Sequence, residues 1–84
     1  MTDAGGESEP SDAEVVQAAA EAAEELVFSR IDRSDVDDLD VTVTFEEGIL
    51  EVDVYLNAAT HVDADQVAED ATLAARAAAD DLLE

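Results

Sequence analysis

The 84-residue chain contains no cysteine, no lysine and no tryptophan, and it has only three glycines and one proline. Without cysteine it can form no disulfide bond, has no thiol nucleophile and can build no cysteine-ligated zinc site. Glycines at positions 5, 6 and 48 cannot form a glycine-rich phosphate-binding loop. No run approaches about 18 apolar residues, so we expect no membrane span. The acidic first ten residues also lack the apolar stretch of a secretory signal.

Basic residues are scarce, because three arginines stand against 24 aspartates and glutamates and leave a formal net charge of −21. Such a chain repels nucleic-acid phosphates, so we expect no direct nucleic-acid binding; its carboxylates attract bulk hydrated cations instead. This self-repulsion opposes folding at ordinary ionic strength, whereas molar salt shortens the Debye length to about 3 Å. The composition therefore favours a halophilic, cytoplasmic protein, with an acidic mesophilic protein as the alternative.

The chain still has material for a core, because 48% of its residues are hydrophobic. Much of this is alanine, with 17 copies, which favours helices but buries little area. Residues 1–10 combine two glycines, a proline and three acids without any apolar period, which predicts a disordered acidic tail. Residues 11–84 are predicted to form a single domain.

Two segments have helical periodicity. Ser11 and Glu14 have the spacing of a capping box, so the first helix is predicted to run from Asp12 to about Ser29. Asp63 is a candidate cap for a second helix that ends near Leu83. The apolar stripe of the first helix is predicted to contain Val15, Ala19, Ala22 and Leu26, with Val16, Ala20, Ala23 and Val27 beside them. That of the second is predicted to contain Val67, Ala71, Ala74, Ala78 and Leu82.

Between the helices, residues 39–45 and 49–56 alternate apolar and polar side chains, as strands with one buried face do. A two-residue turn at Glu47 and Gly48 fixes the register, because a shift by one residue would set apolar against charged side chains. The predicted pairs are Phe45–Leu50, Val43–Val52, Val41–Val54 and Leu39–Leu56. The fold class is α+β, a small helix–strand–strand–helix domain with an antiparallel hairpin packed on two helices.

The residues do not suggest an enzyme. His61 is the single histidine and supplies one ligand, whereas transition-metal sites commonly need three or four. The acids lie on the polar faces of periodic elements, where a solvated surface is the simpler interpretation than an acid–base pair. We therefore expect no catalytic residue, no cofactor and no metal.

Protein–protein contact is the function that the architecture favours. A two-stranded hairpin leaves both strand edges unpaired and is marginal alone, so a partner chain is expected to complete the sheet. Two arginines flank the end of the first helix and a third, Arg76, lies in the second helix. They either offset nearby acids or contact a partner. One aliphatic and one aromatic side chain interrupt the polar sheet face, and an alanine face of the second helix permits close packing. The candidate partner-binding residues are Arg30, Arg33, Ile49, Tyr55, Val67, Ala71 and Ala74.

The chain resembles a small, uncharacterised haloarchaeal-type family whose genes often lie near the one for prefoldin beta. The residues that carry the resemblance are Arg33-Ser34, the strand 41–45, the Glu47-Gly48 turn and the strand 49–55, followed by the last helix. Over residues 14–83 it is similar to the small dimerisation subunit of the KEOPS complex, which makes threonylcarbamoyladenosine in tRNA. It departs from that subunit where residues 1–10 replace a first strand and where Ala71–Ala79 replaces a more polar and aromatic helical segment.

The resemblance implies a divergent paralogue of the KEOPS dimerisation subunit. Such a chain would be a non-enzymatic accessory subunit that pairs with the dimerisation subunit, or with a second copy of itself. The alternative that it implies is a prefoldin-linked or translation-linked small factor in a halophilic archaeon.

Overall fold

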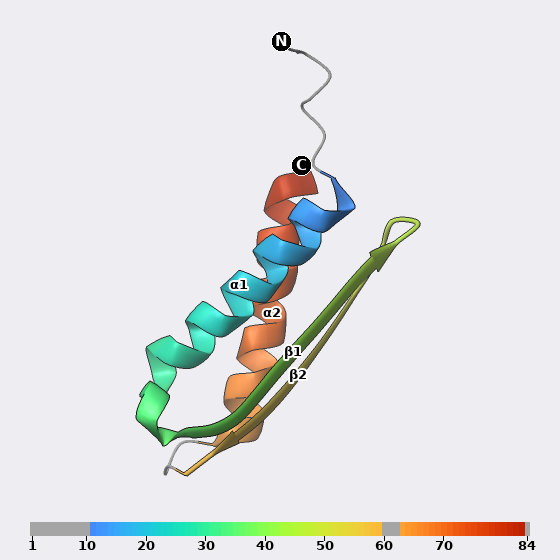
Figure 1. The fold of residues 1–84 in the computed structure, drawn as a ribbon. Helices are drawn as coiled ribbons and strands as arrows, with labels where there is room; N and C mark the ends of the chain where they lie inside the picture. Colours follow the sequence, from blue (N-terminus) through green and yellow to red (C-terminus); the bar gives the residue numbers. More distant parts are fainter. Residues whose placement is uncertain (1–10, 60–62, 84) are drawn as a thin grey trace.

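The computed structural model describes residues 11–59 and 63–83 and confirms the predicted α+β fold. The two helices lie side by side in one layer, and a two-stranded antiparallel hairpin forms the second layer (Figure 1). The predicted tail at residues 1–10, and His61, lie outside the described residues. The elements in chain order are α1 (Asp12–Arg30), the short 3₁₀ turn η2 (Arg33–Asp35), β1 (Val36–Glu46), β2 (Ile49–Ala58) and α2 (Ala64–Leu83).

Both helices begin where the capping residues predict. The Ser11 hydroxyl accepts a hydrogen bond from the Glu14 amide at 3.1 Å, and the Glu14 carboxylate accepts one from the Ser11 amide at 3.0 Å. At α2, a carboxylate oxygen of Asp63 accepts from the amides of Asp65 at 3.1 Å and Gln66 at 3.4 Å. These contacts satisfy amides that have no partner inside the helix.

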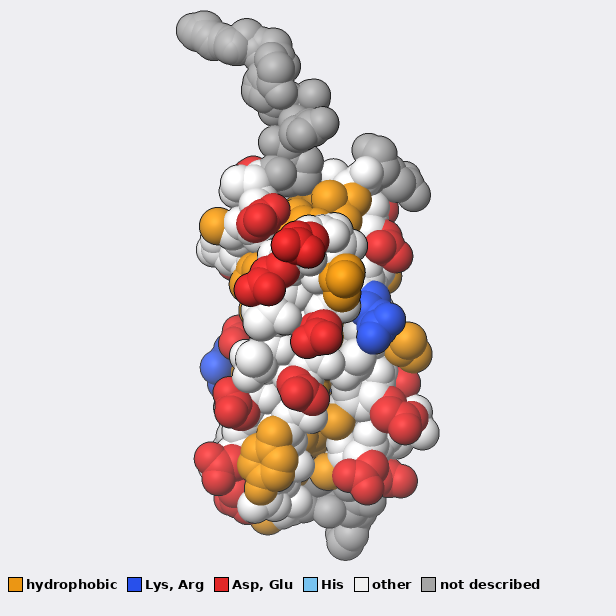
Figure 2. Space-filling view, turned by 90° about the vertical axis from the view of Figure 1, so that its right-hand side faces the viewer, with side chains coloured by type: hydrophobic (Ala, Val, Ile, Leu, Met, Phe, Trp, Pro, Cys, Tyr) orange, Lys and Arg blue, Asp and Glu red, His pale blue; other side chains and the backbone are white. Residues whose placement is uncertain are grey.

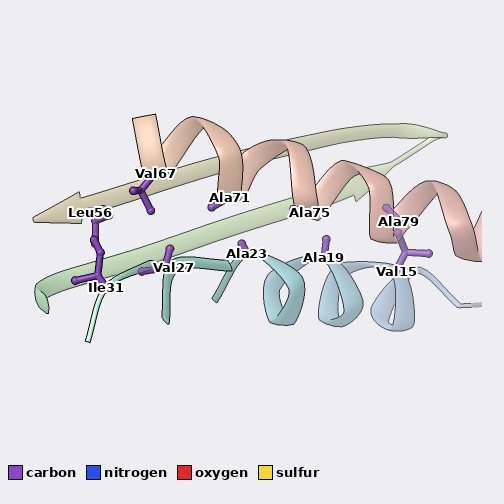
Figure 3. Close-up of a cluster of buried hydrophobic side chains, with 10 residues drawn as sticks. All are labelled: Val15, Ala19, Ala23, Val27, Ile31, Leu56, Val67, Ala71, Ala75 and Ala79. Carbon is purple, nitrogen blue, oxygen red and sulfur yellow. The ribbon is translucent and has the colours of Figure 1, made fainter. Parts of the chain in front are cut away.

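The most completely buried part of the core is the contact between α1 and α2. Each helix contributes four small side chains at intervals of four residues, and these side chains face one another across the contact (Figure 3). Valine and alanine at such positions let two helix backbones approach closely. Along the contact, Val15 faces Ala79, Ala19 faces Ala75, Ala23 faces Ala71 and Val27 faces Val67.

This arrangement corrects part of the predicted stripes. Ala22 and Leu26 in α1, and Ala74 and Ala78 in α2, are only half-buried, and Leu82 is exposed. The buried residues of each helix are four positions apart throughout, whereas the predicted stripes mixed spacings of three and four residues. Since both helices consist largely of alanine, their own periodicity does not choose between adjacent rows, and the packing of one helix on the other decides.

The hairpin has the predicted register. Leu39 pairs with Leu56, Val43 with Val52 and Phe45 with Leu50, so apolar residues stand opposite one another throughout. The turn residues Glu47 and Gly48 have positive φ angles of 52° and 80°. Two positive φ angles match a type I′ turn, whose twist suits a two-residue hairpin loop.

Both strands extend beyond their predicted ends. β1 begins at Val36, three residues before the first predicted position, and β2 continues to Ala58. Val36 pairs with Ala58, a register irregularity follows before Asp38, and the Ala59 amide donates a 2.8 Å hydrogen bond to the Asp35 carbonyl. The aspartates of this segment resemble a loop in sequence, yet pairing with β2 holds them in the sheet.

The sheet is covered less completely than the helix contact. Its helix-facing side chains pack against the core, but only Leu56 reaches full burial and the others stay half-buried. The hairpin tip also stands away from α1 (Figure 1). The half-buried side chains on this face are Leu39, Val41, Val43, Phe45, Leu50, Val52 and Val54.

Candidate interaction surface

The outer face of the hairpin, on the side away from the helices, is polar and acidic. Carboxylates are spread over this side of the molecule, with isolated hydrophobic and basic side chains among them (Figure 2). Ile49 and Tyr55 are 63% and 58% exposed, as their place in the alternation predicted. The cross-strand pairs of this face are Asp40–Tyr55, Thr42–Asp53, Thr44–Glu51 and Glu46–Ile49.

The register and the turn together determine which backbone groups point away from the hairpin. Glu46 and Ile49 flank the two-residue turn, so they form a pair that exchanges hydrogen bonds. Such pairs alternate with non-bonded pairs along an antiparallel ladder. The amides and carbonyls of Val41, Val43 and Phe45 therefore point to the open edge of β1. The turn in the sequence already contained this information, although the direction of these backbone groups was not predicted.

Arg30 is held within the chain. Its guanidinium donates a 2.8 Å hydrogen bond to a carboxylate oxygen of Asp70, which joins the end of α1 to the first half of α2. The Arg30 hydrogen bond lowers the pKa of the Asp70 carboxyl, against partial desolvation, and a hydrogen bond from Gln66 lowers it further. The sequence offered no local signal for this pair, because its members are 40 residues apart.

The other two arginines lie in different surroundings. The Arg33 guanidinium carbon lies 4.2 Å from the centroid of the Phe28 ring, a cation–π contact next to η2. Arg76 projects from α2 and lines a shallow hollow at the hairpin together with Val52 and Asp53. All three arginines were considered as partner contacts in the sequence, and the structure places Arg76 at the hairpin.

The predicted helix residues differ in accessibility. Val67 and Ala71 are completely buried against α1, so in this chain their side chains are not available to a partner. Ala74 is half-buried. The structure thus leaves Arg30, Arg33, Ile49, Tyr55 and the strand edges as the accessible part of the predicted surface.

The described residues contain little that suggests a reactive site. Within residues 11–59 and 63–83, no three histidine, aspartate or glutamate side chains gather in a way that could hold a metal ion. In the same part of the chain, neither helix is both long enough and apolar enough to cross a membrane.

Comparison with known proteins gives a family and no activity. An archaeal family described as "Protein of unknown function (DUF3194)" matches residues 8–82. The chain belongs to the DUF3194 family. An uncharacterised haloarchaeal protein from Natronomonas pharaonis is 50% identical over 76 residues, which are 90% of this DUF3194 chain and 92% of the relative. No solved structure matches the chain.

The DUF3194 match covers α1, both strands and all of α2 except its last residue, so nearly the whole described fold falls within the family. It supports the predicted resemblance to an uncharacterised archaeal family. The predicted links to the KEOPS complex and to prefoldin are not tested by these comparisons and stay predictions.

Proposed function

We propose that this DUF3194 protein is a non-enzymatic interaction subunit that completes its sheet with a partner chain. The observation that carries the proposal is the hairpin, whose two edges pair with no further strand among residues 11–59 and 63–83 and whose helix-facing side is only half-buried. A strand added at one edge would satisfy the free backbone groups, and its inward side chains would cover the exposed parts of this apolar face.

The partner that we propose is the dimerisation subunit of the KEOPS complex, in which this chain would be an accessory subunit. The support is the sequence resemblance over residues 14–83 together with the α+β hairpin fold. The complex, rather than this acidic chain, would contact the tRNA, because the outer sheet face carries carboxylates that repel phosphate. The assembly is proposed to work in a cytoplasm rich in salt.

The test is co-expression with the KEOPS dimerisation subunit encoded in the same genome, followed by sizing with light scattering in molar potassium chloride. We expect a stable one-to-one complex. Monomers of both chains in the mixture would contradict the proposal, and a complex with prefoldin subunits instead would favour the alternative assignment.

Variants of exposed apolar residues locate the surface. If the outer sheet face contributes, Tyr55→Ala combined with Ile49→Ser weakens the complex. Leu73→Ala is the matched control, because Leu73 is 64% exposed on α2 rather than on the sheet. Equal weakening by the control would place the contact on α2.

A further inference from the structure

We infer that the edge of β1 between Asp40 and Glu46 is the docking site, and that it takes an extended peptide segment with an apolar residue at every second position and a basic residue at each end. The inference rests on the proposed function and assigns the strand and the chemistry of the partner. It follows from the direction of the backbone amides and carbonyls at the strand edges, from the charged side chains beside each edge and from the half-buried apolar face of the hairpin.

The two edges offer similar backbone groups but different charges. Arg76 of α2 lines one hollow with Glu51, Val52 and Asp53 of β2 and with Thr42 and Thr44 of β1. Since α2 packs against β2, Arg76 reaches this hollow from the β2 side and offsets part of the charge of Glu51 and Asp53. A basic segment would meet a like charge there. The outward carboxylates of β1 are Asp40 and Glu46, with threonines between them, and the hollows that these two carboxylates line include no arginine among the described residues. Charge therefore directs a basic segment to β1.

The side chains of β1 specify the segment position by position. Neighbours across a new antiparallel ladder have Cβ atoms about 4.5–5.5 Å apart, so opposite charges attract and like charges repel. Lysine or arginine fits opposite Asp40 and Glu46. Apolar residues fit opposite Val41, Val43 and Phe45, where they extend the half-buried face. The matching segment has a basic residue at each end of seven positions, with an apolar residue at every second position.

A second copy of this chain fits this edge less well. Each copy carries a net charge of −21 and no lysine, so self-pairing adds carboxylates where β1 needs cations. A basic segment reduces the charge of the folded chain instead. Its binding should therefore also lower the salt concentration that folding requires, since a ligand of the folded state stabilises that state.

The probe is a synthetic seven-residue peptide with lysine at both ends, valine at the even positions and threonine at the remaining positions. It is added at the lowest potassium chloride concentration that keeps the chain folded, and amide hydrogen exchange is followed by NMR. At about ten times the Kd of the peptide, we expect exchange at Val41, Val43 and Phe45 to slow about tenfold. Val52 and Val54 should not change.

A peptide of the same composition, with its lysines moved to the second and sixth positions, is the control. It has the same charge but the wrong alternation, so it should give little protection. Equal protection by the control would show that attraction between net charges is sufficient, and protection of β2 amides would place the site on the other edge. Either result would overturn the inference.

Two proline variants test the edge in the full chain. Val43→Pro and Val52→Pro change the same residue type in cross-strand partners, and each removes an amide that points to an open edge rather than into the hairpin. We expect Val43→Pro to weaken peptide binding at least tenfold and Val52→Pro to leave it unchanged, with folding checked by circular dichroism. The reverse result would overturn the assignment to β1.

Charge reversal covers the case in which the proline variants do not fold. Glu46→Lys changes an exposed side chain and should weaken binding of the lysine peptide while permitting a peptide with one terminal glutamate. If the Glu46→Lys chain still bound the lysine peptide in preference to the glutamate peptide, the proposed charge pairing would be overturned.

The proline and charge-reversal variants also separate the two proposals. Peptide binding without a complex with the dimerisation subunit refutes only the proposed function, whereas a complex that tolerates Val43→Pro but not Val52→Pro refutes only the β1 assignment.

Discussion

Replacing Ala71 by leucine should test the contact between the two helices directly. Ala71 is completely buried and faces Ala23, which is completely buried as well, so the helices approach with no space for a larger side chain. Leucine has nearly the helix propensity of alanine, so the substitution changes packing and not the preference of the chain for helix. The added carbons must push the helices apart or move into a strained rotamer.

The magnitude follows from this crowding. Overpacking a well-packed core costs about 1–3 kcal/mol in the free energy of unfolding. For a domain of this size, each kcal/mol lowers the melting temperature by about 4–8 °C. Ala77→Leu is the matched control, because Ala77 is exposed on the same helix. It should change stability by no more than about 0.5 kcal/mol.

Urea denaturation at a fixed, high potassium chloride concentration measures both variants. Urea is uncharged, so it does not screen the carboxylates as guanidinium chloride would. If Ala71→Leu were neutral, or if Ala77→Leu were the more damaging of the two, Ala71 could not lie in the contact between α1 and α2.

Two further predictions concern charge. The chain should lose helical circular dichroism at about 10 mM salt and regain it in molar potassium chloride, since the Debye length falls from about 30 to 3 Å; equal helicity in both would refute salt adaptation. Asp70→Asn should destabilise the chain at pH 7 relative to Glu69→Gln, which removes the same charge from an exposed site. Because the pKa of Asp70 is lowered on folding, its pair with Arg30 stabilises the chain above about pH 4 and loses that effect as the pH falls through the lowered pKa. If the difference in stability between Asp70→Asn and Glu69→Gln persisted in acid, the stabilising role of the Asp70–Arg30 pair would be contradicted.

The hairpin was predictable because its information is local. Strict alternation from Leu39 to Phe45, a Glu-Gly turn and a second alternating run leave one register that keeps apolar residues together. The same alternation correctly placed Ile49 and Tyr55 on the exposed face of the hairpin. The start of β1 at Val36 was missed, because aspartates around it suppress the strand signal that pairing with Ala58 overrides.

The helix contact and the surroundings of the arginines were less predictable, because they depend on residues far apart in sequence. In a helix built largely from alanine, Ala74 and Ala75 are equivalent until a second helix packs against one of them. Likewise, nothing near Arg30 in sequence indicates Asp70, and nothing near Arg76 indicates the hollow that it lines at the hairpin. Local patterns determine which face of a strand is apolar, whereas only the packed fold determines which cation lies beside which edge.

Salt and a basic partner would both raise the free energy of unfolding, because both reduce the repulsion between carboxylates in the folded chain. The folded chain concentrates its −21 charge around a core whose largest fully buried side chains are the valines Val15, Val27 and Val67. Dissolved cations screen this repulsion everywhere, while a basic strand at β1 would neutralise it locally and extend the apolar face. If both act, the salt midpoint of the isolated chain must exceed that of the complex. The isolated protein would then exaggerate the salt dependence of the assembly to which it belongs, because part of its stabilisation would reside in the missing strand.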